Sequence, residues 1–317
     1  MLKHHFPNAS DLIYGCMGLG GSWDDAALTR DDKVHAQGAV EAALDAGITV
    51  FDHADIYTLG KAESVFGQLL TDQPHLRDKM ILQSKCAIRF ADAKGPKRYD
   101  FSAEWITQSV EGSLRRLNTE QLDILLLHRP DPLIALDEVA QTLATLITTG
   151  KIKHIGVSNM NRFQMEYLQS ALNTPIVANQ LELSLAARGF VEEAISVNTP
   201  DYGQAGFTAG TVEYCQMHNV QLQAWGALAQ GRFSGGRTQG ATDEATARLV
   251  SELAEKYHVA PEAIVLGWLT RHPARIQPVI GTTNPERIHA CAQAATLSLS
   301  REDWYLLFET VRGQDVP

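Results

Sequence analysis

The sequence has few cysteines, no long hydrophobic run and a deficit of positive charge. Its four cysteines lie far apart, without any Cys-x-x-Cys pair; they are Cys16, Cys86, Cys215 and Cys291. This spacing argues against a zinc site and against a disulfide framework, so we expect buried free thiols. No apolar stretch approaches 18 residues, and no segment is predicted to span a bilayer. The first residues show no apolar signal-peptide segment, and we expect a cytoplasmic protein.

The charge balance is acidic, with 37 Asp and Glu against 27 Lys and Arg and a formal net charge of −10. This balance argues against nucleic acid or an anionic membrane as the main partner. It does not exclude a small anionic ligand, because such a ligand responds to the local charge of its site.

One pattern repeats along the chain: a short apolar run followed by an amphipathic helix. Strands are predicted at residues 12–17, 49–52, 80–86, 123–128, 154–158, 177–181, 221–225 and 278–280. Helices are predicted at residues 30–46, 62–70, 101–117, 136–149, 162–172, 211–218, 261–271 and 285–295. Ser102 is the expected N-cap of the third helix, and Gly150 is the expected residue that ends the fourth.

These eight units predict the fold. Continuous apolar strands are typical of a parallel sheet that is covered on both faces. Eight successive units indicate a closed (β/α)8 TIM barrel, with an open α/β sheet as the alternative. No linker divides the chain, so we expect one domain over residues 1–317. Residues 184–210, a helix at 242–258 and a C-terminal helix at 301–313 lie outside the repeat. The long loops at the C-terminal face are expected to govern substrate selectivity.

Polar side chains follow the apolar runs of six predicted strands, where a buried core would continue apolar. The strands end in Asp52-His53-Ala54-Asp55-Ile56-Tyr57, Ser84-Lys85, His128-Arg129, Ser158-Asn159, Asn179-Gln180 and Trp225-Gly226. Such positions face the mouth of a barrel, where active sites are found. One polar strand end is weak evidence, but six in register predict a site.

Four of these side chains suggest a chemistry: Asp52, Tyr57, Lys85 and His128. A free tyrosine has a pKa of about 10, and a nearby lysine ammonium is expected to lower it. An aspartate would hold the lysine charged, and a histidine would orient a carbonyl oxygen. The set suits protonation of an alkoxide as it forms at a carbonyl carbon. The sequence offers no metal-ligand cluster, so a bound cofactor must supply the electrons.

The ordered motifs resemble the aldo-keto reductase family. The stretch from Asp52 to Tyr57, with Glu63 and Gly67, is similar to the family's D-T-A-x-x-Y…E…G signature. Five further segments are similar to family motifs: Gln-Ser-Lys-Cys around Lys85, Leu-Leu-His-Arg-Pro-Asp at 126–131, Gly-Val-Ser-Asn at 156–159, Asn-Gln-Leu-Glu at 179–182 and Ile-Gly-Thr-Thr-Asn-Pro-Glu-Arg at 280–287. The resemblance runs over residues 12–295 and is strongest to a bacterial subgroup of uncharacterised predicted oxidoreductases.

The resemblance implies an NADP(H)-dependent oxidoreductase that reduces an aldehyde or ketone to an alcohol by hydride transfer. By position, Tyr57 would be the general acid, Lys85 would lower the pKa of Tyr57, Asp52 would pair with Lys85, and His128 would orient the carbonyl. The implied cofactor contacts are Ser158, Asn159 and Gln180 at the nicotinamide carboxamide, Trp225 on the ring face, Gly226, Leu228, Gln230 and Gly231 near the pyrophosphate, and Gly281, Thr282, Thr283 and Arg287 near the adenosine phosphate.

Arg287 is expected to give most of the preference for NADPH, since a guanidinium suits a 2′-phosphate. The Gly18-Leu19-Gly20-Gly21 run is interpreted as the turn after the first strand, near the cofactor, and not as a dinucleotide-binding loop. Trp23 follows that strand and is a candidate for the substrate pocket, although simple packing is the alternative. The sequence assigns no role to His53.

Two other functions remain open on the sequence. A regulatory subunit of the same fold would bind NADP(H) with little turnover. A class I aldolase would use Lys85 to form a Schiff base. The expected partner is a small carbonyl or alcohol substrate, and the expected state is a monomer or a weak oligomer.

Overall fold

The computed structural model describes residues 2–317, and its centre is a closed ring of eight parallel strands. The ring order is β1-β10-β9-β8-β7-β6-β3-β2. The strands are β1 (Ile13–Gly15), β2 (Val50–Asp52), β3 (Ile81–Cys86), β6 (Leu122–Leu127), β7 (Ile152–Ser158), β8 (Ile176–Glu182), β9 (Gln221–Trp225) and β10 (Gln277–Ile280). Each predicted strand is present, and the (β/α)8 barrel is confirmed.

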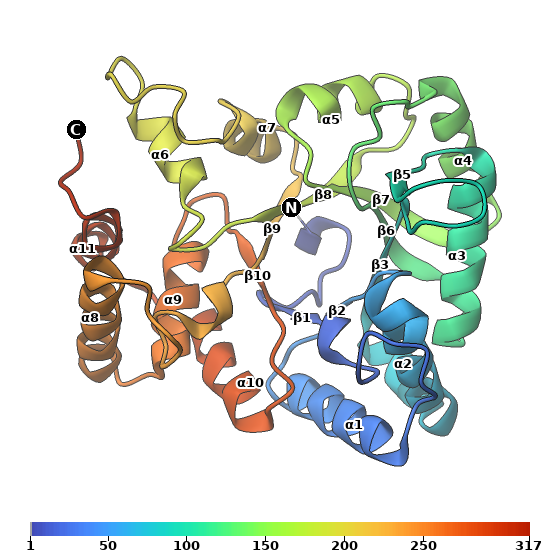
Figure 1. Cartoon of the computed structure of the whole chain (residues 1–317), viewed down its shortest axis with the longest axis horizontal. Coiled ribbons are helices and arrows are strands. Elements are labelled where there is room, and N and C mark those ends of the chain that lie inside the picture. The colour runs from blue at the N-terminus through green and yellow to red at the C-terminus, as the bar shows by residue number, and fades with distance from the viewer. Residues whose placement is uncertain (1) are drawn as a thin grey trace.

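Helices surround the ring of strands (Figure 1). Those of the eight repeats are α1 (Arg30–Asp45), α2 (Lys61–Asp72), α3 (Ala103–Leu117), α4 (Leu136–Thr148), α5 (Arg162–Gln169), α7 (Thr211–Met217), α9 (Pro261–Thr270) and α10 (Pro285–Ala292). Ser102 accepts a hydrogen bond from the Trp105 amide, as expected of the N-cap of α3. Gly150 follows α4 with φ of 74°, the left-handed conformation that ends many helices.

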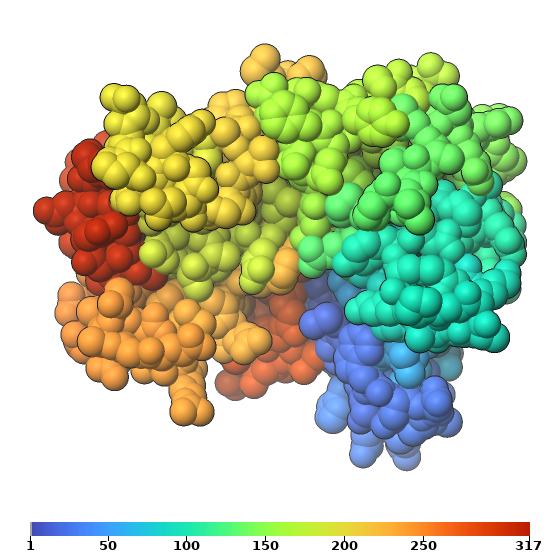
Figure 2. Space-filling view, turned by 45° about the horizontal axis from the view of Figure 1, so that its top comes forward, coloured from blue at the N-terminus to red at the C-terminus, as the bar shows by residue number. Residues whose placement is uncertain are grey.

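Several elements lie outside the repeat. The helices α8 (Ala241–Tyr257) and α11 (Arg301–Arg312) are close to the predicted extra helices. Residues 184–210, for which the sequence predicts no helix, contain the short helix α6 (Gly189–Ile195). Figure 2 shows this yellow segment beside the red C-terminal end, and Arg312 donates to Glu192 there at 2.9 Å. A contact from Arg312, near the end of the chain, therefore helps to hold a helix that the local sequence does not predict.

Short elements complete the chain. The hairpin of β4 (Ile88–Arg89) and β5 (Arg98–Tyr99) was not predicted, because two-residue strands give no alternating pattern. The 3₁₀ turns are η1 (Leu2–His4), η2 (Cys16–Gly18), η3 (Tyr57–Gly60), η4 (Pro74–Lys79), η5 (Ala229–Gly231) and η6 (Gln293–Ala295).

The inside of the barrel is layered from apolar to polar. Its lower part holds Ile13, Val50, Ile81, Ile124, Leu126 and Ala178, and the N-terminal segment closes it from below with Leu2. Gly156 has no space for a side chain, since a Cβ there would lie 2.2 Å from Leu126. Towards the C-terminal strand ends the inward side chains become polar, beginning with Asp52, Gln83, Gln180 and Gln223. The polar layer and the strand ends above it position the candidate site.

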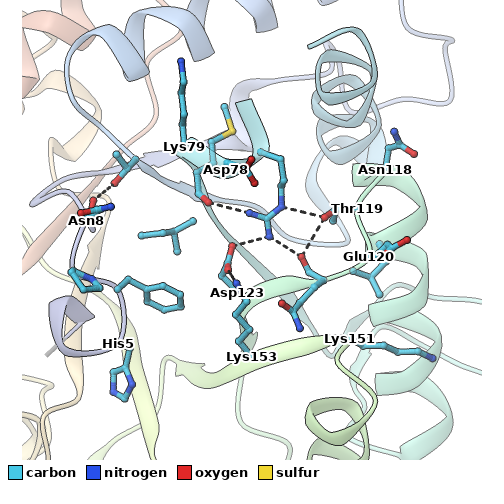
Figure 3. Close-up of a pocket in the computed structure, with 18 of the residues that line it drawn as sticks. His5, Asn8, Asp78, Lys79, Asn118, Thr119, Glu120, Asp123, Lys151 and Lys153 are labelled. Carbon is cyan, nitrogen blue, oxygen red and sulfur yellow. Dashed lines mark hydrogen bonds and ion pairs between the residues drawn. The ribbon is translucent and has the colours of Figure 1, made fainter. Parts of the chain in front are cut away.

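A large cavity, about 1380 Å³, lies at the opposite end, where the strands begin (Figure 3). There the nearly buried Asp123 accepts hydrogen bonds from Arg77 at 3.0 Å and from Lys153 at 2.6 Å. Arg77 also donates to the Gln121 carbonyl at 3.0 Å. These bonds join neighbouring strand starts, and polar groups at this end of a barrel contribute to stability. Size alone therefore does not locate the functional site.

All four cysteines are buried and unbonded to one another, as the sequence predicted. Among residues 2–317, no helix combines the length and the apolar character needed to cross a membrane.

Candidate active site

Lys85 is at the centre of a tight polar cluster at the C-terminal end of β3. Its Nζ donates to Asp52 Oδ2 at 2.7 Å, to the His53 carbonyl at 2.9 Å and to the Tyr57 hydroxyl at 2.9 Å. An ammonium has three N–H donors, so each has an acceptor. Lys85 and Asp52 are only 1 % and 2 % exposed, which makes this a fully buried ion pair. The structure brings together three of the four residues that the sequence placed in the catalytic set.

The electrostatics of Tyr57 differ from the expectation. Burial raises the pKa of Tyr57 above its ordinary value of 10, and Lys85 offsets only part of this effect. Burial also opposes the charge on Lys85, but Asp52 and Tyr57 outweigh it and raise the pKa of Lys85. Lys85 therefore lowers the pKa of Tyr57 as expected, but burial outweighs this contribution and the net pKa is raised. Tyr57 is a neutral phenol at physiological pH and has a proton to give.

His128 completes the set from the end of β6. Its ring lies edge-on to the ring of Tyr57, with centroids 6.2 Å apart. Burial lowers the pKa of His128 to about 2, helped by the charges of Lys85 and Arg129, so the ring is neutral. Within residues 2–317 its Nδ1 has no hydrogen-bond partner. A neutral imidazole can donate one hydrogen bond to a carbonyl oxygen without supplying a charge.

The turn that holds Tyr57 is strained. Thr58 and Leu59 have φ of 45° and 58°, a conformation that non-glycine residues seldom adopt and that clusters at functional sites. The Thr58 hydroxyl is tied to the Leu19 carbonyl at 3.0 Å. Behind this turn, the fully buried Glu63 accepts from Ser84 at 2.6 Å and from Arg116 at 2.8 Å. These bonds connect α2 with β3 and α3, next to Lys85.

The close approach of α2 and α3 requires a glycine. A Cβ on Gly67 would lie 2.0 Å from the Arg116 carbonyl oxygen, well inside van der Waals contact. The absence of a side chain at Gly67 thereby lets α3 approach α2, where Arg116 pairs with Glu63.

Polar groups at the ends of β7 and β9 form a second cluster. The Asn159 Nδ2 donates to the His128 carbonyl at 3.1 Å and to Ser158 Oγ at 2.8 Å. The Asn159 Oδ1 accepts from Trp225 Nε1 at 3.1 Å, which leaves one of its lone pairs for a ligand. The Ser158 hydroxyl donates to the Gln180 carbonyl at 2.9 Å. The structure therefore brings Ser158, Asn159, Gln180 and Trp225 together, beside His128.

Two glutamines that the sequence analysis did not single out lie just below this cluster. Gln83 and Gln223 are completely buried and hydrogen-bonded to each other, and they connect Asp52 with Gln180. A signal was present: a polar residue stands two positions before Lys85 and another two before Trp225, at strand positions that are fully buried. Their meeting depends on which strands face each other across the barrel.

The loop after β9 has an unusual backbone. Gly226, Ala229, Gln230 and Gly231 all have positive φ, between 46° and 80°. Successive residues of this kind turn amide N–H groups toward a common side, where an anion can bind. Leu228 begins this turn as the residue before η5.

Arg287 joins this loop to the start of α10. A terminal nitrogen of Arg287 lies 3.5 Å from the point where a Gly231 Cβ would stand. Its Nε donates to the nearly buried Glu262 at 3.2 Å, which orients the guanidinium of a side chain that remains 45 % exposed. The two segments expected to hold the remote end of a cofactor are thus adjacent. The ion pair with Glu262 was not foreseen.

A recess lies between these segments and the N-terminal loop. Figure 2 shows the blue loop after β1 and the orange segment after β9 on either side of a hollow, with red-orange residues of the β10 and α10 region between them. A Cβ on Gly18 would be 3.4 Å from both the Gly281 carbonyl and the Thr283 side chain. The Gly18 turn therefore borders the segment that contains Gly281, Thr282 and Thr283.

Three further residues occupy informative positions. Trp23 is 52 % exposed on the loop after β1, at the same end of the barrel. His53 is fully buried against Phe66, and neither ring nitrogen has a partner among residues 2–317. Burial lowers the pKa of His53 to about 3, so it packs as a neutral ring. Burial raises the pKa of Asp55 to about 7, helped by the nearby Glu63.

No group of His, Cys, Asp and Glu side chains in residues 2–317 is arranged to hold a metal ion.

Comparisons with known proteins find bacterial oxidoreductases that are similar over most of the chain. One relative is the 6-dehydroglucose reductase of Agrobacterium fabrum, 36 % identical over 312 residues, which are 97 % of this chain and 96 % of that protein. Oxidoreductase YdhF of Escherichia coli is 35 % identical over 284 residues, or 88 % of each chain. Another relative, from Bacillus subtilis, is the uncharacterized oxidoreductase YcsN, 35 % identical over 88 % of each chain.

Solved structures share the fold. An aldo-keto reductase from Klebsiella pneumoniae in complex with NADPH has a TM-score of 0.72 and 26 % identity, and the match covers 94 % of this chain and 90 % of that one. The glycerol dehydrogenase of Gluconobacter oxydans has a TM-score of 0.78 at 24 % identity, covering 96 % and 92 %, which supports the fold alone. The model of the aldo/keto reductase family matches residues 11–310. The chain therefore belongs to the aldo/keto reductase family, as its motifs predicted.

Proposed function

We propose that this protein is an NADP(H)-dependent reductase of aldehydes or ketones, with Tyr57 as the general acid. The observation that carries the proposal is the buried Asp52–Lys85–Tyr57 chain, with hydrogen bonds of 2.7 and 2.9 Å. A neutral phenol at the end of a buried ion pair is suited to give a proton to an oxygen that is becoming an alkoxide. The family and the NADPH complex of the Klebsiella relative support the same reaction class.

The residues present fit a nicotinamide cofactor. The indole of Trp225 offers a ring face at the mouth, and its N–H already fixes Asn159. Ser158, Asn159 and Gln180 would hold the carboxamide. The turn of Gly226, Leu228, Gln230 and Gly231 would hold the pyrophosphate, and Gly281, Thr282, Thr283 and Arg287 the adenosine end. When bound, NADPH supplies the hydride that reduces the carbonyl carbon.

Side chains of the protein would orient the substrate oxygen and transfer the proton to it. His128, neutral because burial lowers its pKa, would donate a hydrogen bond to the substrate oxygen and aim it at Tyr57. As negative charge develops on that oxygen, the Tyr57 hydroxyl would transfer its proton. Lys85 would stabilise the phenolate left behind, since its Nζ lies 2.9 Å from the phenolic oxygen. Asp52 keeps Lys85 charged and in place, so the site resets when Tyr57 regains a proton.

The two alternatives fit the geometry less well. A Schiff-base lysine must become a free amine, but Lys85 gives all three N–H groups to acceptors and its pKa is raised. A regulatory subunit would need no acid–base set, yet Tyr57, Lys85, Asp52 and His128 are all in place. We therefore favour a cytoplasmic, single-domain enzyme over both.

A sugar aldehyde is the substrate class to test first. Two relatives are named 6-dehydroglucose reductase, at 36 % and 32 % identity. The exposed Trp23 beside the mouth would offer a flat apolar face to a sugar ring.

The test of the proposal replaces Tyr57 by phenylalanine. We expect the Tyr57→Phe variant to lose carbonyl reduction by at least about 100-fold, because general acid catalysis contributes 10²–10⁴-fold. NADPH binding, followed by quenching of tryptophan fluorescence, should stay within about twofold of the wild type. Activity would be followed by loss of NADPH absorbance over a panel of sugar, aliphatic and aromatic aldehydes. Retained turnover in the variant would remove Tyr57 from its assigned role.

A further inference from the structure

A line of polar side chains crosses the inside of the barrel just below the candidate site. Gln83 is on β3 and Gln223 is on β9, strands that lie halfway round the ring from each other. Gln83 Nε2 donates to Gln223 Oε1 at 2.9 Å, and Gln223 Nε2 donates to Gln83 Oε1 at 2.9 Å. The two amides thus form a reciprocal pair across the lumen, and neither side chain is exposed.

Each end of this pair reaches a residue of the site. Gln83 Nε2 uses its second N–H to donate to Asp52 Oδ1 at 2.6 Å. On the other side, Gln180 Nε2 donates to Gln223 Oε1 at 3.0 Å. The strand registers place Asp52 opposite Gln83 and Gln180 opposite Gln223, so all four side chains share one layer. Asp52 and Gln180 are each 2 % exposed.

The charge at one end fixes the orientation of every amide in the line. An ionised carboxylate only accepts hydrogen bonds, so Gln83 must turn its NH₂ toward Asp52. The Gln83 oxygen must then face the NH₂ of Gln223, which leaves the Gln223 oxygen to accept from Gln83 and Gln180. Gln180 consequently directs its NH₂ toward Gln223, and its Oε1 is available as an acceptor. Any flipped amide would place two oxygens or two NH₂ groups against each other in a dry interior, which is costly.

We propose that Gln83 and Gln223 are positioning residues that hold the Gln180 amide in one orientation, with its Oε1 presented to the NH₂ of the nicotinamide carboxamide. This inference rests on the proposed function, because Gln180 would contact that group only in a nicotinamide-binding site. The line also ties the acid–base half of the site, at Asp52, to the cofactor half, at Gln180. The ion pair that orients Tyr57 therefore also sets which hydrogen-bonding group meets the cofactor.

The orientation predicts a preference for the carboxamide of the cofactor. In the 3-acetylpyridine analogue of NADPH, a methyl group replaces the NH₂, so it cannot donate to Gln180 Oε1. The analogue would leave this buried oxygen without a partner. We expect the wild-type protein to bind NADPH about five- to tenfold more tightly than the analogue, which corresponds to a hydrogen bond of about 1–1.4 kcal/mol.

The test is Gln223→Met, which keeps the length of the side chain and removes its hydrogen bonds. Without Gln223 the Gln180 amide is free to flip, so the ratio of the two dissociation constants should fall toward one. Binding is measured by titration calorimetry or fluorescence quenching, without any turnover. The matched control is Gln221→Met on the same strand, because Gln221 donates to the Arg275 carbonyl at the far end of the barrel. The control should keep the wild-type ratio.

A second variant covers the case in which Gln223→Met does not fold. The double variant Gln83→Met, Gln223→Met replaces both members of the pair, which is less costly than leaving one amide unpaired. Its ratio should also be close to one. A wild-type ratio in either variant would overturn the inference, as would equal binding of both cofactors by the wild-type protein, while the proposed function would stand. If the wild-type protein binds neither cofactor, the proposed function fails as well.

Discussion

Asp55 is expected to make the stability of this protein fall as pH rises through the neutral range. Its Oδ1 is buried and has no hydrogen-bond partner among residues 2–317. Burial raises the pKa of Asp55 from 3.8 to about 7, and the charge of the fully buried Glu63 adds to the shift. Between pH 4 and 7 the folded state therefore keeps a proton on Asp55, whereas the unfolded state has already released it.

The magnitude follows from proton linkage. An acid whose pKa is raised on folding has its full stability below the unfolded pKa and loses it as pH rises to the folded pKa. A shift of three units corresponds to about 4 kcal/mol at pH 8 and about 1.6 kcal/mol at pH 5. Asp55 is only partly buried as a whole residue, and solvent screening weakens its interactions. The two free energies are therefore upper limits. Between pH 5 and 8 we expect a loss of roughly 2 kcal/mol from this group.

The assay is urea unfolding of the wild type and of Asp55→Asn at several pH values from 5 to 8. The asparagine has a similar shape and no titration, so the variant should gain stability relative to the wild type as pH rises. Asp25→Asn provides the control, because Asp25 is exposed. Its difference from the wild type should not change with pH. If the Asp55→Asn and wild-type curves run parallel over this range, Asp55 does not carry a raised pKa.

Four further outcomes follow from the structure. Because the pKa of Tyr57 is raised above 10 and that of His128 is about 2, carbonyl reduction should vary little between pH 5 and 9, whereas alcohol oxidation should rise with pH. A fall in reduction rate centred near pH 7 would contradict both assignments. Gly67→Ala should lower the free energy of unfolding by about 1–3 kcal/mol, because its Cβ would meet the backbone of α3. Gly38→Ala on α1, where a Cβ meets nothing within 4 Å, should instead stabilise by about 0.5–1 kcal/mol in the same urea titrations. Arg287→Ala should weaken NADPH binding about tenfold or more and NADH binding little, and equal losses in calorimetry would show that Arg287 does not contact the 2′-phosphate.

The predictions from sequence were most accurate where the signal is local. The eight strand–helix units are set by runs of apolar residues and by caps such as Ser102, so they could be predicted directly. The hairpin of β4 and β5 and the helix α6 could not be predicted in this way. Two-residue strands carry no period, and α6 is held in part by the distant Arg312.

The candidate site divides in the same way. The chain alone determined which residue types follow each strand, and therefore that Asp52, Tyr57, Lys85 and His128 meet at one end of a barrel. It did not determine their electrostatics, since the net pKa of Tyr57 depends on how much burial outweighs the effect of Lys85.

Only the tertiary structure decided what lies across the barrel. The sequence shows Gln83 and Gln223 as polar residues 140 positions apart in two different strands, with nothing to relate them. Ring closure places β3 and β9 opposite each other, and the strand registers bring both amides to the level of Asp52 and Gln180. The physical reason is that the position of each inward side chain along a strand is local information. Which side chains face each other is fixed only when the sheet closes.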